Sequence, residues 1–176
     1  FTAEGRRWGE HRKLALRALG QHALPGFFPL LQRIAVDLHT RWTEQAGRPV
    51  PILDDFVCFT VDVTTELAFS DRAGSLAGQR SSLLADLDPI FPAIGRRLYS
   101  LLPTWRWFRS AGDRELDEAV ARVRAYLEET VERARNNPER SGFLGLMLDE
   151  TDGAGSFDEA ALFGNAVTML LAGEDT

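Results

Sequence analysis

Apolar residues recur at helical spacing along almost the whole chain, and this feature most restricts the folds that the sequence can adopt. Side chains three and four positions apart lie on one face of a helix, whereas a half-buried strand alternates apolar and polar residues. No stretch alternates convincingly. Segment 48–53 is extended at most, because Pro49 and Pro51 cannot donate to a sheet. The sequence therefore predicts a mainly α-helical fold.

Turn-forming residues divide this pattern into separate helices. Pro25, Gly26 and Pro29 are expected to break the chain before the second helix, and Pro89 and Pro92 to bend or break the fourth. The predicted helices cover about residues 5–19, 30–44, 54–69, 81–97, 111–136 and 142–150, and a last helix begins near residue 156.

Helix caps and the composition of the last helix refine this prediction. Asp54 or Asp55 is the expected N-cap of the third helix, and Ser156 with Glu159 has the spacing of a capping box. The last helix is apolar nearly all round up to Ala172. We therefore expect it to be central and buried.

The composition is that of a globular protein. Of the 176 residues, 44% are hydrophobic and 26% are charged, and the net charge of −6 argues against a general nucleic-acid binder. Cys58 is the one cysteine, so no intrachain disulfide can form, which fits a reducing compartment. No apolar run has the roughly 20 residues of a membrane span. These features predict a cytoplasmic protein.

The two ends of the sequence resemble cuts through a longer protein. The chain begins with Phe1 rather than methionine, and it stops at Thr176 within a helical pattern. We expect residues 1–176 to form a single partial domain that is truncated at both ends.

Trp8 and Arg12 form the first constellation of interest. On a helical wheel Arg12 falls within the apolar stripe of its helix, one turn from Trp8, with His11 at the edge of that stripe. A buried guanidinium needs an anionic partner, and the indole N–H of tryptophan adds a second donor for one carboxylate. The pattern leaves two possibilities open, a structural salt bridge or an anionic ligand.

The second constellation closes the chain. Ala172 and Gly173 are small and leave room for a flat ligand or a diatomic molecule, whereas Asp175 and Thr176 can relay a proton in an otherwise dry pocket. The alternative is that Gly173 is a C-cap and the polar residues mark the exit of the helix from the core.

Three stretches resemble the cytochrome P-450 haem-thiolate monooxygenases, of a bacterial, soluble-looking type. Residues 1–19 contain Trp-x-x-x-Arg as Trp8 and Arg12, residues 59–71 resemble the helix that follows, and residues 166–176 contain the (Ala/Gly)-Gly-x-(Asp/Glu)-Thr motif of the oxygen-activation helix. The resemblance spans the whole chain. It implies a mainly α-helical fragment of the P-450 fold, on the distal side of the haem, without the Cys-ligand region and most of the β-sheet.

The resemblance also implies roles for the first helix. Trp8 and Arg12 would hold a propionate of haem b, with assistance from His11. The basic residues Arg6, Lys13 and Arg17, on the other face of this helix, would either dock a redox partner or be merely solvated.

On the last helix, the resemblance implies that Asp175 and Thr176 are catalytic and manage proton delivery to dioxygen. Ala172 and Gly173 would border the oxygen and cofactor pocket. Met169 and Asn165 would lie further along, in the substrate pocket.

The implied reaction inserts one oxygen atom from dioxygen into a small organic substrate. NAD(P)H would supply the electrons through a ferredoxin or flavin reductase partner. The axial cysteine of the family follows the oxygen-activation helix, so no metal ligand is expected in this chain, and Cys58 is expected to be a small core residue. The fragment alone would then be inactive.

A non-enzymatic α-helical module for ligand binding or regulation is the alternative. It would explain the helices and would make Arg12 part of a structural ion pair. It does not predict Ala-Gly-x-Asp-Thr on the most buried helix.

Overall fold

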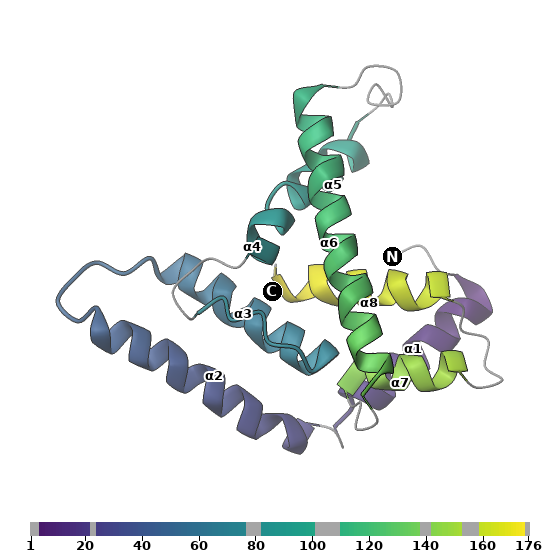
Figure 1. Ribbon diagram of the computed structural model, residues 1–176, viewed down its shortest axis with the longest axis horizontal. Coiled ribbons are helices and arrows are strands. Elements are labelled where there is room, and N and C mark those ends of the chain that lie inside the picture. Colours follow the sequence, from purple (N-terminus) through teal and green to yellow (C-terminus); the bar gives the residue numbers. More distant parts are fainter. Residues whose placement is uncertain are drawn as a thin grey trace.

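The structure, a computed structural model, describes residues 4–21, 24–76, 82–100, 110–137, 142–152 and 159–174. Within these ranges it contains α-helices and no strand (Figure 1), which confirms the predicted mainly α-helical fold. The helices are α1 (Gly5–Leu19), α2 (Leu24–Glu44), α3 (Ile52–Phe69), α4 (Ser82–Leu87), α5 (Ile90–Leu98), α6 (Ala111–Arg135), α7 (Gly142–Asp152) and α8 (Glu159–Glu174).

Helix α8 lies in the middle of the molecule. It packs most extensively against α3 and also contacts α6 and α7, and α6 crosses it in the view of Figure 1. On the far side of α3 lies α2, whereas α1 packs against α7 and α4 against α6. The last helix is thus as central as its apolar sequence predicts. It is not buried all round, because Ala160, Gly164 and Ala172 are exposed.

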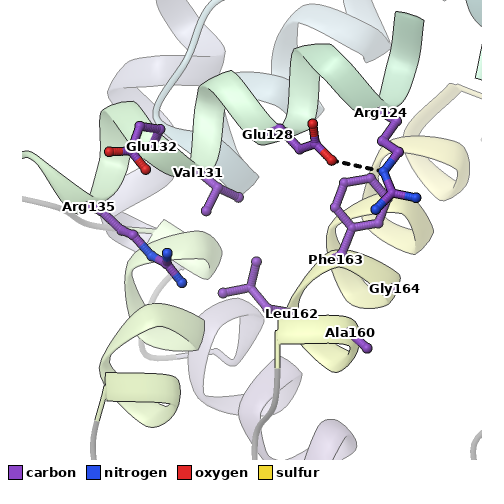
Figure 2. Close-up of a pocket in the computed structure, with 9 residues that line it drawn as sticks. All are labelled: Arg124, Glu128, Val131, Glu132, Arg135, Ala160, Leu162, Phe163 and Gly164. Carbon is purple, nitrogen blue, oxygen red and sulfur yellow. Dashed lines mark hydrogen bonds and ion pairs between the residues drawn. The ribbon is translucent and has the colours of Figure 1, made fainter. Parts of the chain in front are cut away.

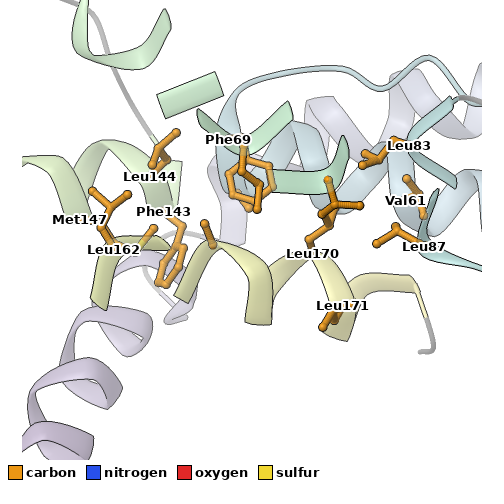
Figure 3. Close-up of a cluster of buried hydrophobic side chains, with 14 of the residues drawn as sticks. Val61, Phe69, Leu83, Leu87, Phe143, Leu144, Met147, Leu162, Leu170 and Leu171 are labelled. Atoms are coloured by element: carbon orange, nitrogen blue, oxygen red, sulfur yellow. The ribbon is translucent and has the colours of Figure 1, made fainter. Parts of the chain in front are cut away.

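One large hydrophobic cluster surrounds α8 (Figure 3). Leu162, Ala166 and Leu170 of α8 are almost completely buried, and they meet apolar side chains from α3, α4 and α7. Prominent members from those helices are Val61, Phe69, Leu83, Leu87, Phe143, Leu144 and Met147. Burial of this apolar surface is the main force that holds the helices together.

A smaller cluster fills the space between α2 and α3. Ile34, Leu38, Cys58 and Leu76 are buried in it. Cys58 is therefore a core residue, as predicted, and it packs as a small apolar side chain.

Two predicted helix starts are wrong. The second helix begins at Leu24 and continues through Pro29. Pro25 lies in the first turn, where a backbone N–H would have no helical partner. Pro29 removes one helical hydrogen bond, the one to the carbonyl oxygen of Pro25, and Pro25 is exposed. The third helix begins at Ile52 and has Pro51 at the N-cap, so neither Asp54 nor Asp55 caps it.

The remaining boundaries follow the sequence closely. The predicted fourth helix breaks into α4 and α5 before Ile90, and Pro92 is accommodated in the first turn of α5. At the start of α6, the Ser110 hydroxyl accepts a hydrogen bond from the Asp113 N–H, and the Asp113 carboxylate accepts one from the Ser110 N–H. The Ser110 N–H and the Ser110 hydroxyl both donate to the Asp113 carboxylate, and they hold its pKa below the usual value. The capping box predicted at Ser156 lies outside the described residues.

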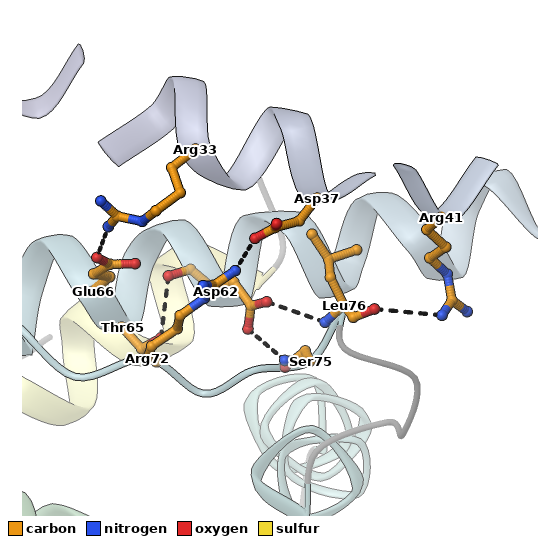
Figure 4. Close-up of polar contacts among 9 residues, drawn as sticks. All are labelled: Arg33, Asp37, Arg41, Asp62, Thr65, Glu66, Arg72, Ser75 and Leu76. Atoms are coloured by element: carbon orange, nitrogen blue, oxygen red, sulfur yellow. Dashed lines mark hydrogen bonds and ion pairs between the residues drawn. The ribbon is translucent and has the colours of Figure 1, made fainter. Parts of the chain in front are cut away.

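Polar contacts fix the segment after α3 in place (Figure 4). The completely buried Asp62 carboxylate accepts hydrogen bonds from the backbone N–H groups of Ser75, at 2.7 Å, and Leu76, at 3.1 Å. An ion pair joins Arg72 of this segment to Asp37 of α2, and another joins Arg33 of α2 to Glu66 of α3. The segment thereby covers the cluster between α2 and α3.

None of the described helices is both long and apolar enough to cross a membrane.

Candidate functional site

The faces of α1 differ from the wheel prediction. The helix packs on α7 and the core through Leu14 and Ala18, which lie roughly 80–120° around the helix from Trp8. Trp8 and Leu16 are 51% and 58% exposed, and Arg12 between them is exposed as well. The prediction that Arg12 is buried is therefore wrong for this chain. The part of the stripe formed by Trp8, Arg12 and Leu16 faces outward, whereas Ala15 and Leu19 of the same stripe pack against the core.

Arg12 stacks on the neighbouring tryptophan. Its guanidinium carbon lies 5.2 Å from the centroid of the Trp8 ring, within the range of a cation–π interaction. In the part of the chain that the structure describes, no carboxylate pairs with Arg12, whereas Arg41 and Arg133 each pair with an aspartate. The structural salt bridge, one of the two possibilities for Arg12, is not formed within the described ranges.

This stripe suits a flat ligand that is apolar in its body and anionic at its edge. Trp8 and Leu16 offer apolar surface one turn to either side of Arg12. The guanidinium provides a delocalised cation with several N–H donors, and the indole provides one more. A haem with its propionates has this combination of properties, so the residues present fit the group that the resemblance implies.

His11 connects α1 to α8. Its Nδ1 atom lies 3.2 Å from the side-chain nitrogen of Asn165, and that nitrogen also donates to the Ala161 carbonyl oxygen at 2.7 Å. Both side chains are half-buried. His11 is predicted to bind the cofactor and Asn165 to line the substrate pocket. The structure places these two side chains in direct contact.

The end of α8 packs against α3. A Cβ atom added to Gly173 would overlap the side chain of Thr64, so glycine is needed here for the close approach of two helices. The space beside Gly173 predicted for a ligand is therefore filled by Thr64 on this side. Ala172 is exposed and Met169 is partly buried against the core.

The predicted catalytic pair lies outside the described residues. Asp175 and Thr176 follow directly after α8, whose last residue is Glu174. Since Gly173 is still helical, it is not the C-cap of the alternative interpretation.

A buried ionic site that the sequence reasoning missed lies between α2 and α3. The Asp55 carboxylate is 1% exposed and accepts hydrogen bonds from Arg41 Nε and Trp42 Nε1, each at 2.9 Å. Arginine and tryptophan together do hold one carboxylate in this chain, at a place other than the predicted one. The signal was present, because Asp55 and Asp62 share a helical face with Cys58.

A surface groove of about 660 Å³ runs between α6 and the first half of α8 (Figure 2). Leu162 and Val131 provide apolar lining, and the Arg124 guanidinium lies 5.2 Å from the centroid of the Phe163 ring and donates to Glu128 at 2.8 Å. None of the predicted site residues that the structure describes lines this groove.

Within the described ranges, no group of three or more histidine, cysteine, aspartate or glutamate side chains is arranged to hold a metal ion.

Comparisons with known proteins find similar sequences. Among curated proteins, the steroid 21-hydroxylase of Sus scrofa is 24% identical over 178 residues, which cover 96% of this chain and 36% of that protein. Cytochrome P450 CYP749A22 of Panax ginseng is 28% identical over 68 residues, which cover 39% of this chain and 13% of that protein. Since these relatives come from a mammal and a plant, the bacterial origin stays a prediction.

Solved structures give the same result for the fold. The heme domain of cytochrome P450DA superposes with a TM-score of 0.78 at 24% identity, over 97% of this chain and 37% of that one. A triple mutant of that heme domain gives a TM-score of 0.79 at 25% identity, over 98% of this chain and 38% of that one. The chain thus spans little more than a third of the length of the relatives that match nearly all of it.

The family comparison covers the complete chain. A family model described as Cytochrome P450 matches residues 1–176, the same span over which the helices and the two end motifs show the resemblance. The chain therefore belongs to the cytochrome P450 family.

Proposed function

We propose that this chain is part of a haem-dependent monooxygenase that inserts one oxygen atom from dioxygen into a small organic substrate. The observation that carries the proposal is the exposed stripe of α1. There Arg12 lies on Trp8 and has no carboxylate partner among the described residues. A cation held in this way on an apolar face is suited to an anionic, flat cofactor.

Trp8 and Arg12 hold a propionate of haem b in this proposal. The indole Nε1–H and the guanidinium N–H groups donate to the carboxylate, and Leu16 contributes apolar surface beside them. When bound, the haem would supply the redox chemistry of the reaction.

In this proposal, the two residues that follow α8 in the sequence handle protons. Asp175 exchanges a proton with solvent, and the Thr176 hydroxyl holds it in the pocket by accepting and donating hydrogen bonds. Ala172, exposed at the end of the helix, and Met169 border the space for oxygen and substrate. The apolar character of α8 keeps this space dry.

A redox partner supplies the electrons, which come from NAD(P)H through a ferredoxin or a flavin reductase. Lys13 is exposed on α1, whereas Arg6 pairs with Glu10 and Arg17 pairs with Glu150 at 2.6 Å. Of the basic residues predicted for the partner surface, Lys13 is thus the one without an ion pair among the described residues.

The test of the proposed chemistry is Thr176→Ala in the full-length enzyme. Product formed per dioxygen consumed is expected to fall at least about ten-fold, because a positioned proton donor is lost. Haem content, measured by absorbance, is expected to stay unchanged. Thr168→Val is the matched control, since the Thr168 hydroxyl donates to the Gly164 carbonyl of its own helix. Unchanged coupling in Thr176→Ala would contradict the assignment.

The alternative of a non-enzymatic regulatory module has less support. It relied on a structural ion pair for Arg12, which is not formed within the described ranges, and it does not account for a family match along the complete chain. A full-length protein that binds no haem would favour that alternative.

A further inference from the structure

The contact between His11 and Asn165 joins α1, which contains the proposed propionate ligands Trp8 and Arg12, to α8. The two residues are 154 positions apart, and their nitrogens lie 3.2 Å from each other. His11 directly precedes Arg12, and Asn165 lies in the first half of α8. A contact at this place therefore affects how the stripe of α1 is held relative to α8.

The orientation of the Asn165 amide follows from its second contact. The atom 2.7 Å from the Ala161 carbonyl oxygen must be a donor, because a carbonyl oxygen only accepts. That atom is therefore the amide nitrogen. Its second hydrogen is available for the nearby Nδ1 atom of His11.

This orientation determines the tautomer of the histidine. An Nδ1 atom that accepts a hydrogen bond carries no proton, so the neutral imidazole has its N–H on Nε2. An imidazole can assist in holding a carboxylate only through an N–H group. Any hydrogen bond from His11 to a propionate must then come from Nε2.

We infer that Asn165 is a positioning residue for the cofactor helix, because it keeps His11 in the Nε2–H tautomer and ties α1 to α8. The inference rests on the proposed function for its consequence, haem retention. It replaces the predicted role of Asn165 in the substrate pocket. In this inference, His11 and Asn165 act together to position the cofactor helix.

The direct test is ¹⁵N NMR of the full-length holoenzyme labelled at histidine. The ferrous form with carbon monoxide is diamagnetic and suits this measurement at mildly alkaline pH. His11 is assigned by the signals that disappear in His11→Gln. We expect an unprotonated Nδ1 and a protonated Nε2, and a protonated Nδ1 in the wild type would overturn the inference.

Asn165→Asp provides a sharper comparison. The carboxylate has no hydrogen to donate, so His11 must protonate Nδ1 to keep the contact, whatever the state of Nε2. Thr168→Val, on the same helix, removes a similar bond to a carbonyl four residues earlier and is expected to leave the His11 spectrum unchanged. An unprotonated Nδ1 in Asn165→Asp would contradict the proposed hydrogen bond.

The consequence for the cofactor is tested by haem release to excess apomyoglobin. Asn165→Leu is expected to release haem about ten-fold faster, because His11 loses its hydrogen bond to Asn165. Thr168→Val is expected to release haem at the wild-type rate. An unchanged rate in Asn165→Leu would overturn the positioning role. A full-length protein without haem would instead refute the proposed function, and its histidine spectrum would still report on the hydrogen bond.

Discussion

Asp55 is a buried carboxylate whose two hydrogen bonds come from adjacent residues of α2. Arg41 and Trp42 donate to its two oxygens, and the Trp42 ring also packs edge-on against Phe56, with centroids 5.7 Å apart. A buried ion pair of this kind is expensive to break, because the remaining partner stays desolvated. Asp55 therefore fixes the angle at which α2 meets α3.

We predict that Asp55→Ala lowers the free energy of unfolding of the full-length enzyme by about 3 kcal/mol, since Arg41 and Trp42 both lose their acceptor. Asp55→Asn keeps an acceptor oxygen and is expected to lose less. Chemical denaturation monitors both variants. Asp54→Ala is the matched control, because Asp54 is exposed. Equal stabilities for Asp55→Ala and Asp54→Ala would contradict this assignment.

Asp71 forms a second, more exposed charge cluster just after α3. It accepts hydrogen bonds from Arg133, at 2.9 and 3.0 Å, and from the Tyr126 hydroxyl at 3.0 Å. Burial by itself raises the pKa of Asp71, but the hydrogen bonds and the Arg133 charge outweigh it, and the pKa lies below the usual 3.8. Burial, followed by the charge of Asp71, raises the pKa of Tyr126.

The lowered pKa of Asp71 predicts a pH dependence. A carboxylate with a lowered pKa stabilises the fold above its unfolded pKa, and the contribution disappears as the pH falls through the folded value. We expect Asp71→Asn to be less stable than the wild type by about 1 kcal/mol at pH 7 and at pH 5. Below about pH 4 the difference should shrink. Denaturation curves at each pH measure it, and a difference that persists unchanged at about pH 3 would refute the role of this carboxylate.

At the scale of the elements, α3 and α8 cross at Gly173, a residue of the proposed oxygen motif. Gly173 and Thr64 meet at this crossing without space for a Cβ atom. The motif glycine is therefore a packing residue as well as a part of the motif. Helices that approach this closely transmit small changes of side-chain volume, because protein interiors are close-packed.

Two glycines of α8 provide a matched pair for testing this crossing. Gly173→Ala is expected to destabilise the full-length enzyme by about 2 kcal/mol through overlap with Thr64. Gly164→Ala, where a Cβ atom would meet nothing within 4 Å, is expected to stabilise it by up to about 1 kcal/mol through helix propensity. Thermal unfolding measures both. A gain in stability for Gly173→Ala would show that the crossing is looser than described.

The sequence predicts the elements well where its own spacing decides the outcome. The bounds of α1 and α6, and the break before Ile90, follow from local periodicity, proline and caps. The start of α2 does not, because a proline early in a helix is tolerated when only first-turn bonds are lost. Local rules exaggerate the effect of such a proline.

The candidate site is less predictable than the elements, for the same physical reason in each case. A wheel shows which residues share a face, but the neighbouring helices decide which face is buried. For α1 the contact with α7 buries Leu14 and leaves Arg12 outside. The partners of Asn165 and Gly173 are 154 and 109 residues away, which no local pattern reveals.

At the scale of the whole molecule, the fold places two sequence-distant motifs on neighbouring helices. The first, on α1, offers a cation and an aromatic ring, and the second, of which the structure describes Ala172 and Gly173 at the end of α8, offers small residues. Family membership along residues 1–176 explains why one chain contains both. The central claim is that these motifs serve one bound haem.

Haem release from the full-length enzyme tests this claim most directly. Arg12→Leu removes the cation of the exposed stripe, whereas Lys13→Leu removes an exposed cation from the next position of the same helix. Loss of Arg12 is expected to speed transfer of haem to apomyoglobin at least about ten-fold, because a charge-assisted hydrogen bond to a propionate is lost. Lys13→Leu should release haem at the wild-type rate. Equal haem release from Arg12→Leu and the wild type would contradict the account.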